Sequence, residues 1–149
     1  MIKTSWAKLI QASRVADAYL TKHPEKTKLE YAIQRTLSRI AKTNDGLQEQ
    51  LETIDIDHAS TDKDGILLTG PNGYQFTPEK KKARNAKRTA LIKAVDVEID
   101  PYFASEIPDD ISEADLDAFE GIIIRTADVE RIRAMREDEP EKGRTAEAS

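Results

Sequence analysis

The chain contains no cysteine and only two histidines, and aromatic residues make up just 5% of its 149 residues. Without cysteine it forms no disulfide, no thiolate metal site and no thiol nucleophile, and a reducing compartment is compatible with it. Neither His23 nor His58 belongs to a helical HExxH motif. We therefore expect an aliphatic core, and any metal or acid–base chemistry would have to rest on carboxylates.

Long apolar runs are also missing, since nowhere do eighteen apolar residues follow one another. The first residues, MIKTSWAKLIQAS, lack an uninterrupted apolar stretch followed by a cleavage site. We expect a cytoplasmic protein without membrane contact. The net charge of -5 argues against indiscriminate nucleic-acid binding by the whole molecule, although a local basic face could still act.

Charge is plentiful but unevenly placed. Seven Lys/Arg and no acid lie between Lys80 and Lys93, whereas ten Asp/Glu and no base lie between Asp96 and Gly121. Such blocks either neutralise each other within the fold or present surfaces of opposite sign to partners. Because a strand is expected directly after the basic segment, we expect part of the contrast to be neutralised internally. If the cations face away from the acids, the basic segment becomes the foremost binding surface.

The first third of the chain predicts two helices. Thr4 or Ser5 can cap a first helix that ends before His23-Pro24, and Thr27 with Glu30 forms a capping box for a second. The short turn between them predicts an antiparallel helical hairpin over about 5–52. Asn44-Asp45-Gly46 marks a weak point or an early end of the second helix.

The middle of the chain predicts strands. Three short runs alternate or are rich in strand-forming residues: 54–57, 66–69 and 74–76. Asp64-Gly65 and Pro71-Asn72-Gly73 supply residues suited to positive φ between them. These features predict an antiparallel meander of three strands, followed by a basic helix that Thr77-Pro78-Glu79 opens and that runs to about Ala94.

The last part alternates short strands and helices. Val95 to Asp100 predicts a strand with Val97 and Ile99 inward. Ser112 caps a short helix that Gly121 closes, Ile122-Ile123-Ile124 is a candidate buried strand, and Thr126 precedes a last helix. The expected fold is α+β: a single domain over 1–136 with an N-terminal helical hairpin, a strand-rich part over about 54–124 with a three- to four-stranded antiparallel sheet, a last helix over about 127–136, and a flexible charged tail over 137–149.

One acidic cluster is a candidate metal site: Asp55, Asp57, His58, Asp62 and Asp64. Aligning it with an EF-hand loop puts Ser60 at the first ligand position and Pro71 at the twelfth, where an acid is needed. Outward strand positions and turns explain these acids better. We assign no metal, cofactor or catalytic residue and expect no enzyme, with a metal-dependent enzyme using the cluster as an open alternative.

The basic helix is the candidate contact site, because four cations recur at helical spacing: Lys80, Arg84, Lys87 and Arg88. Such a stripe could bind phosphates of a nucleic acid. A solvated or internally paired face is favoured over it, since no aromatic residue is interleaved to stack bases.

Two segments carry a resemblance to a group of known proteins: the helix LEYAIQRTLSRIAKTNDGLQEQLE, and ASTDKDGILLTGPNGYQFTPEKKKARNAKRTALIKAVDVEIDPYF after it. In style, the chain from Leu29 to Ile124 resembles small uncharacterised proteins of tailed bacteriophages and prophages. The resemblance implies a phage source, with location in the host cytoplasm or the virion, and transfers no site residues.

The resulting hypothesis is a non-enzymatic protein-interaction protein. It would be either a virion or assembly component or a small effector that binds a host protein. A nucleic-acid-associated protein that uses the basic helix is the alternative.

Overall fold

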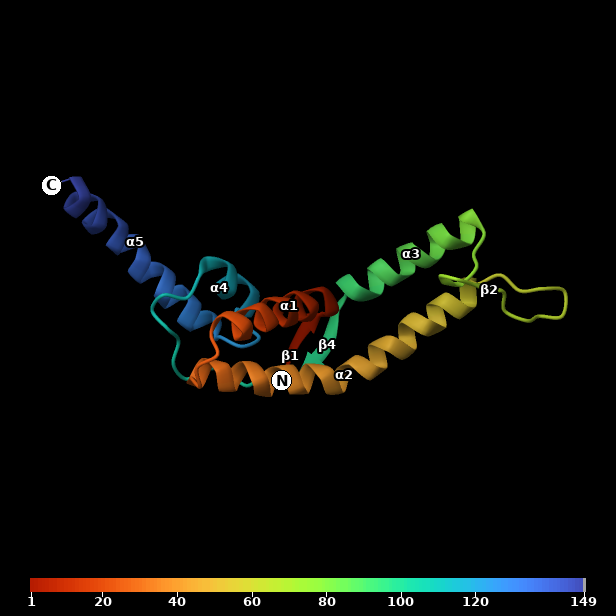
Figure 1. Cartoon of the computed structure of the whole chain (residues 1–149), viewed down its shortest axis with the longest axis horizontal. Helices are drawn as coiled ribbons and strands as arrows, with labels where there is room; N and C mark the ends of the chain where they lie inside the picture. The colour runs from red at the N-terminus through yellow and green to blue at the C-terminus, as the bar shows by residue number, and fades with distance from the viewer. Residues whose placement is uncertain (149) are drawn as a thin grey trace.

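The computed structural model describes the backbone of residues 1–148 and the side chains of residues 1–137. This part of the chain forms nine elements, labelled in Figure 1 where there is room: β1 (Ile2–Ser5), α1 (Trp6–Lys22), α2 (Lys28–His58), β2 (Thr69–Gly70), β3 (Gly73–Tyr74), α3 (Pro78–Lys93), β4 (Val95–Ile99), α4 (Glu113–Phe119) and α5 (Thr126–Ala148). The α+β class is confirmed. The predicted sheet of three or four strands is wrong, because the strands form two separate two-stranded antiparallel sheets.

The helical hairpin is confirmed, and its ends follow from local capping. Ser5 accepts a hydrogen bond from the Lys8 amide to begin α1, and Thr27 accepts one from the Glu30 amide to begin α2. Leu9, Leu29 and Ile33 are fully buried where these helices meet the rest of the core. The core is aliphatic, as the composition predicted.

Helix α2 does not stop at Asn44-Asp45-Gly46 but continues for 31 residues, which is roughly 46 Å. The predicted strand over 54–57 is therefore wrong, since these residues are the end of α2. Leu47, Leu51 and His58 continue the buried side of the helix at steps of four and seven. That helical periodicity outweighs the short alternation of Ile and Asp.

The predicted meander reduces to a minimal hairpin. Thr69 pairs with Tyr74 and Gly70 with Gly73, and Thr61 forms an isolated bridge with Leu67. The turn glycines were predicted correctly, because Gly65 and Gly73 have φ values of 80° and 94°. The predicted strand over 66–69 is otherwise wrong: only Thr69 belongs to a strand, although Leu68 exchanges backbone hydrogen bonds with Ser60 and Gln75.

The second sheet joins the two halves of the chain. β4 is confirmed with Val97 and Ile99 buried, and it pairs antiparallel with β1, so that Ile2 faces Ile99 and Thr4 faces Val97. The sequence did not predict β1. Its four residues overlap the cap of α1, which hid the strand signal.

The C-terminal part completes the core. α4 ends with Gly121 at φ 77°, as its position after the helix predicted. Ile122, Ile123 and Ile124 are buried, but the predicted strand is wrong: they form a turn with only an isolated bridge from Glu120 to Ile124. α5 extends past the predicted range 127–136. Within the expected tail 137–149, side chains from 138 onward and all of Ser149 lie outside the described residues, so the flexible tail stays a prediction.

The molecule has two parts, which Figure 1 shows side by side. We call the first the body: α1, the first half of α2, the β1–β4 sheet, α4 and the start of α5. We call the second the arm: residues 44–93, comprising the second half of α2, the tip loop 59–77 and α3. α3 returns beside α2 and leads into β4, and β2 lies at the far end of the arm (Figure 1).

Candidate interaction surface

Helix α3 is held to α2 by one carboxylate. Arg84 donates from Nε to Oδ1 of Asp55 at 2.7 Å, and Arg88 donates from Nη1 to both carboxylate oxygens at 3.0 Å. All three side chains are only partly exposed. Two charge-assisted contacts on a half-buried acid are stronger than surface pairs, so this cluster fixes the spacing of the arm helices.

The four predicted contact residues therefore divide into two pairs. Arg84 and Arg88 are turned toward α2, whereas Lys80 and Lys87 are exposed. Ala83 and Ala86 of α3 are exposed, whereas Leu91 and Ile92 are half-buried against the core. The arginines face inward because Asp55, now on a helix, lies opposite them.

Apart from Glu79 at the start of α3, each helix of the arm carries one sign of charge. α2 exposes four acids in its second half: Asp45, Glu49, Glu52 and Asp57. α3 exposes five lysines: Lys80, Lys81, Lys82, Lys87 and Lys93. Across the described residues, no ion pair joins 80–93 to the acidic segment 96–121. Since the cations of α3 are not paired with the acids that follow them in the sequence, α3 is the foremost basic surface.

The expected neutralisation of the basic segment by the acids that follow it is wrong, because the paired acids of 96–121 bind cations in other parts of the chain. Asp100 pairs with Arg39 of α2, and Glu113 is bound by Arg133 and Arg136 of α5. Hydrogen bonds from both arginines lower the pKa of Glu113. These contacts tie the loop before α4 to the body.

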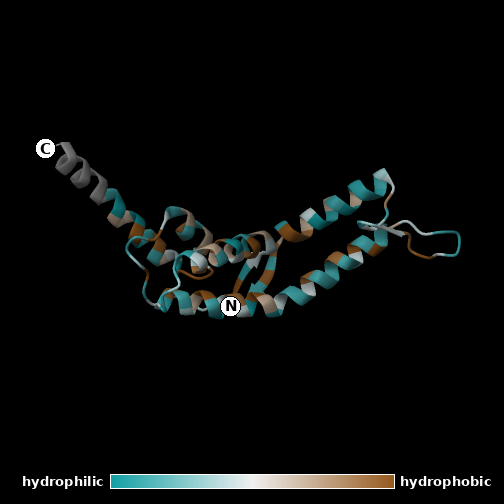
Figure 2. Ribbon diagram, in the orientation of Figure 1, coloured by the Kyte–Doolittle hydropathy of each residue, from teal (hydrophilic) through white to brown (hydrophobic). Residues whose placement is uncertain are grey.

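The tip of the arm exposes apolar side chains. Ile66 is 63% exposed, and Leu68 is 37% exposed. Asp62 shapes the turn beneath them by accepting hydrogen bonds from the amides of Asp64 and Ile66 at 2.8 and 3.0 Å. Figure 2 shows a hydrophobic stretch in the loop at the far end of the arm.

The acidic cluster predicted as a metal alternative is dispersed. Asp55 is bound by two arginines, Asp62 holds the tip turn, and the Nδ1 atom of buried His58 lies 2.7 Å from the Ile54 carbonyl oxygen. Within residues 1–137, no group of three or more potential ligands is placed to hold a metal ion. Turn and helix contacts account for Asp55, Asp62 and His58 individually.

Two other titratable groups in the body have shifted pKa values. Burial lowers the pKa of Lys8, against the opposing effect of Asp117 and Glu120, and its Nζ donates to the Asp117 carbonyl at 2.6 Å. Burial raises the pKa of Tyr19, and nearby acids add to the effect. Tyr19 also stacks on His23 and meets Phe119 edge to face. Both groups join α1 to α4.

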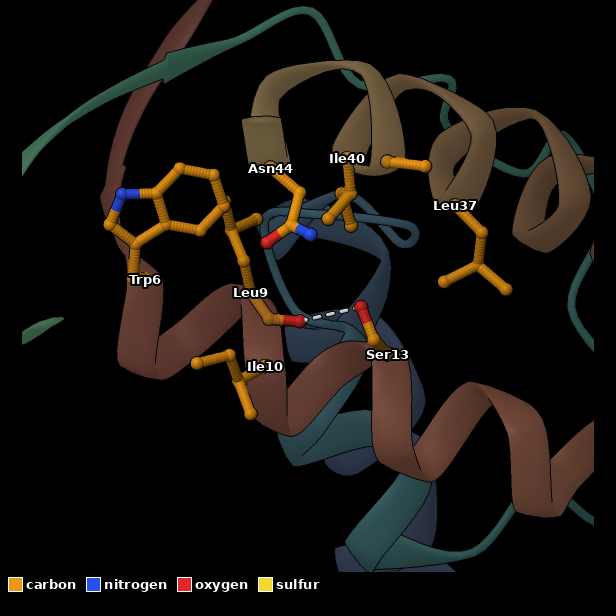
Figure 3. A pocket seen from close by; sticks show the side chains of 8 residues that line it. Trp6, Leu9, Ile10, Ser13, Leu37, Ile40 and Asn44 are labelled. Carbon is orange, nitrogen blue, oxygen red and sulfur yellow. Dashed lines mark hydrogen bonds between the residues drawn. The ribbon is translucent and has the colours of Figure 1, made fainter. Parts of the chain in front are cut away.

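A hollow of about 220 Å³ lies between α1 and α2 (Figure 3). Eight residues line it, and none of them carries a titratable group: Trp6, Leu9, Ile10, Ser13, Leu37, Ile40, Ala41 and Asn44. Ser13 donates to the Leu9 carbonyl at 2.8 Å, which satisfies its hydroxyl within the helix. This hollow is a packing gap of the hairpin and brings no reactive pair together.

Sequence reasoning missed an aromatic and basic cluster at the other end of α2. Tyr31, Arg35 and Arg39 recur at steps of four, which a helical projection would have placed on one side. Tyr102, however, reaches them only through the tertiary fold, with its ring centroid 5.3 Å from that of Tyr31. No spacing in the sequence indicated that partner.

Comparison of the chain with protein-family models, curated proteins and solved structures finds no match in any of the three. In the part of the chain that the structure describes, no helix combines the length and the hydropathy that a membrane span requires.

Proposed function

We propose that the protein is a non-enzymatic interaction protein and that the arm is its contact element. The observation that carries this proposal is α3 itself: a helix of 16 residues, none of which is buried. Only Leu91 and Ile92, near its C-terminal end, pack against the core, and both are half-buried. Its exposed surface is therefore available for a partner.

The surface of the arm suits a protein partner. The exposed Ile66 and Leu68 at the tip provide an apolar anchor. The exposed lysines of α3 add positive charge to the same arm. Protein interfaces commonly combine an apolar centre with a polar rim that steers association. We infer that the tip makes the central contact and that α3 governs the rate and the salt dependence of binding.

The test uses the full chain with a photo-crosslinking residue at position 66, incubated with a lysate of the source cell. We expect one discrete stoichiometric adduct. The matched control carries the same residue at position 25, an exposed site in the α1–α2 turn, and should give none. Equal adducts from both positions, or none from either, would overturn the proposal.

A second pair of variants distinguishes the tip from the helix. The double variant Ile66→Asp, Leu68→Asp should abolish binding of the crosslinked partner. It should leave the melting temperature unchanged, since both side chains are exposed. The double variant Lys80→Glu, Lys87→Glu should weaken partner binding mainly at low salt.

If the protein is of phage origin, as the resemblance implies, two kinds of interaction protein are proposed: a virion or assembly component and an effector that binds a host protein. Detection of the chain in purified particles would favour a virion or assembly component. A complex with a cellular protein in lysate would favour an effector, and absence from both would exclude the phage-type hypothesis.

The alternatives have their own outcomes. Salt-dependent binding of duplex DNA that charge reversal at Lys80 and Lys87 abolishes would favour the nucleic-acid alternative. Heat of binding with Mg²⁺, Mn²⁺ or Ca²⁺ that Asp57→Asn removes would favour the metal-dependent alternative.

A further inference from the structure

Two tyrosines form an exposed aromatic corner on the body, away from the arm. Tyr31 lies on α2 and Tyr102 on the segment after β4, and their rings meet edge to face with an interplanar angle of 81°. Tyr31 is 49% exposed and Tyr102 is 37% exposed. Much of both rings is thus left uncovered by the core.

Buried polar contacts hold Tyr102 in place. The hydroxyl of Thr36, which is fully buried, donates to the Tyr102 carbonyl and accepts from the Tyr102 amide, both at 3.1 Å. Two residues earlier, Arg39 donates to the Asp100 carbonyl at 2.6 Å. The backbone beneath the exposed ring is therefore fixed on α2, which preorganises the corner for binding.

Two arginine guanidinium groups lie over the rings. The Arg35 guanidinium lies 5.7 Å from the Tyr31 centroid and 6.0 Å from the Tyr102 centroid, and Arg39 lies 5.9 Å from the latter. Lys26 and Lys28, with both tyrosines, line a hollow of about 470 Å³.

Three carboxylates balance part of this charge. Glu30 pairs with Lys26 at 3.6 Å, Glu106 with Lys28 at 3.1 Å, and Asp100 with Arg39 at 3.5 Å. The lysines are highly exposed, with side chains 89% and 62% accessible, so their pairs are weak and exchange readily for a phosphate. Within residues 1–137, Arg35 has no ion pair.

We propose that this corner binds a nucleotide unit, with the base stacked on the exposed tyrosine surface and the phosphate held by Lys26, Lys28 or Arg35. Aromatic rings that bases stack on, flanked by cations that track phosphates, are the means by which single strands are bound without sequence preference. The hollow is of a size that takes a small ligand. This site is separate from the arm, and it does not depend on the function proposed for the arm.

The ligand is either a free nucleotide or a unit of a single strand, and one titration separates them. The probe is a fluorescein-labelled oligo(dA) about twelve nucleotides long, read by anisotropy with the full chain at low salt. We expect binding that weakens as salt rises. If AMP displaces the labelled oligo(dA), the site is assigned to the free nucleotide. If unlabelled oligo(dA) displaces it and AMP does not, the site is assigned to a strand. Either result supports the proposal.

The variants decide whether the corner is responsible. Tyr102→Ala, which leaves the backbone contacts to Thr36 available, should weaken binding about tenfold. Arg35→Ala should weaken it less and flatten its salt dependence. Because Arg35 is exposed, this variant keeps the test valid if Tyr102→Ala does not fold. The matched control is Tyr74→Ala on the arm, which should bind as the natural chain does.

Three results would overturn the proposal. One is the absence of binding to both oligo(dA) and AMP at low salt. Another is an equal loss in Tyr102→Ala and Tyr74→Ala, or a loss only when Lys80 and Lys87 are reversed, which would move the contact to α3. The last is competition by a proline-rich peptide with no dependence on salt, which would make the tyrosines a peptide site.

Discussion

The two halves of α2 lie in the same helix but stabilise the molecule differently. The first half buries five side chains in the body: Leu29, Ala32, Ile33, Thr36 and Ile40. The second half buries three in the arm, opposite an α3 that buries none. The body is therefore held by apolar burial, whereas the arm depends on few contacts and on the cluster of Asp55 with two arginines. We expect the arm to open locally at a lower free energy than the body unfolds.

The largest expected effect lies in the body. Phe119 is fully buried and meets Tyr19 edge to face, so Phe119→Ala should lower the free energy of unfolding by about 3–5 kcal/mol. Urea denaturation measures it. Leu51→Ala in the arm is the matched comparison, and an equal or greater loss there would contradict the difference between the two parts.

Asp55→Ala tests what holds the arm. It leaves Arg84 and Arg88 without their shared acid, and it should destabilise the α2–α3 contact by about 1–3 kcal/mol. Hydrogen exchange should speed up across α3 and stay unchanged in α1. Glu52→Ala, the loss of an exposed acid from the same helix, is the control and should change neither.

Two glycines with positive φ provide a smaller, paired test. Gly121→Ala in the body should lower the free energy of unfolding by about 1 kcal/mol, from backbone strain alone, since the nearest atom to an added Cβ is 3.9 Å away. Gly73→Ala has open space around it and should disturb only the tip. A larger global loss from Gly73→Ala would mean that the hairpin supports the body.

The smallest expected effect is a pH dependence in the body. Because the folded-state pKa of Glu113 lies below its ordinary value of 4.5, the contacts with Arg133 and Arg136 stabilise the fold fully above that pH. This stabilisation should fall away as pH drops through the lowered pKa. Unfolding of Glu113→Gln should lack that part of the acid dependence, whereas Glu79→Gln on the arm should keep it.

Features set by neighbours in the sequence were predictable. The caps at Ser5, Thr27, Thr77 and Ser112 all form, because each needs only a side-chain oxygen and an amide three residues on. The turn glycines follow from the same local logic. The starts of these four helices thus rest on short-range chemistry.

Features set by distant contacts were not predictable. The run 54–57 alternates like a strand, but continuation of the helical face and the pairing of Asp55 keep it in α2. β1 exists because β4 passes beside it, and Tyr102 joins Tyr31 through Thr36. In each case the deciding partner lies at least 29 residues away along the chain.

The most direct test of the account is segment-resolved hydrogen exchange of the full chain without any partner. We predict that amides of α3 exchange through a local opening, well before those of α1 and the first half of α2, which exchange only through global unfolding. Protection of α3 equal to that of α1 would contradict the distinction between a stable body and an arm available for contact.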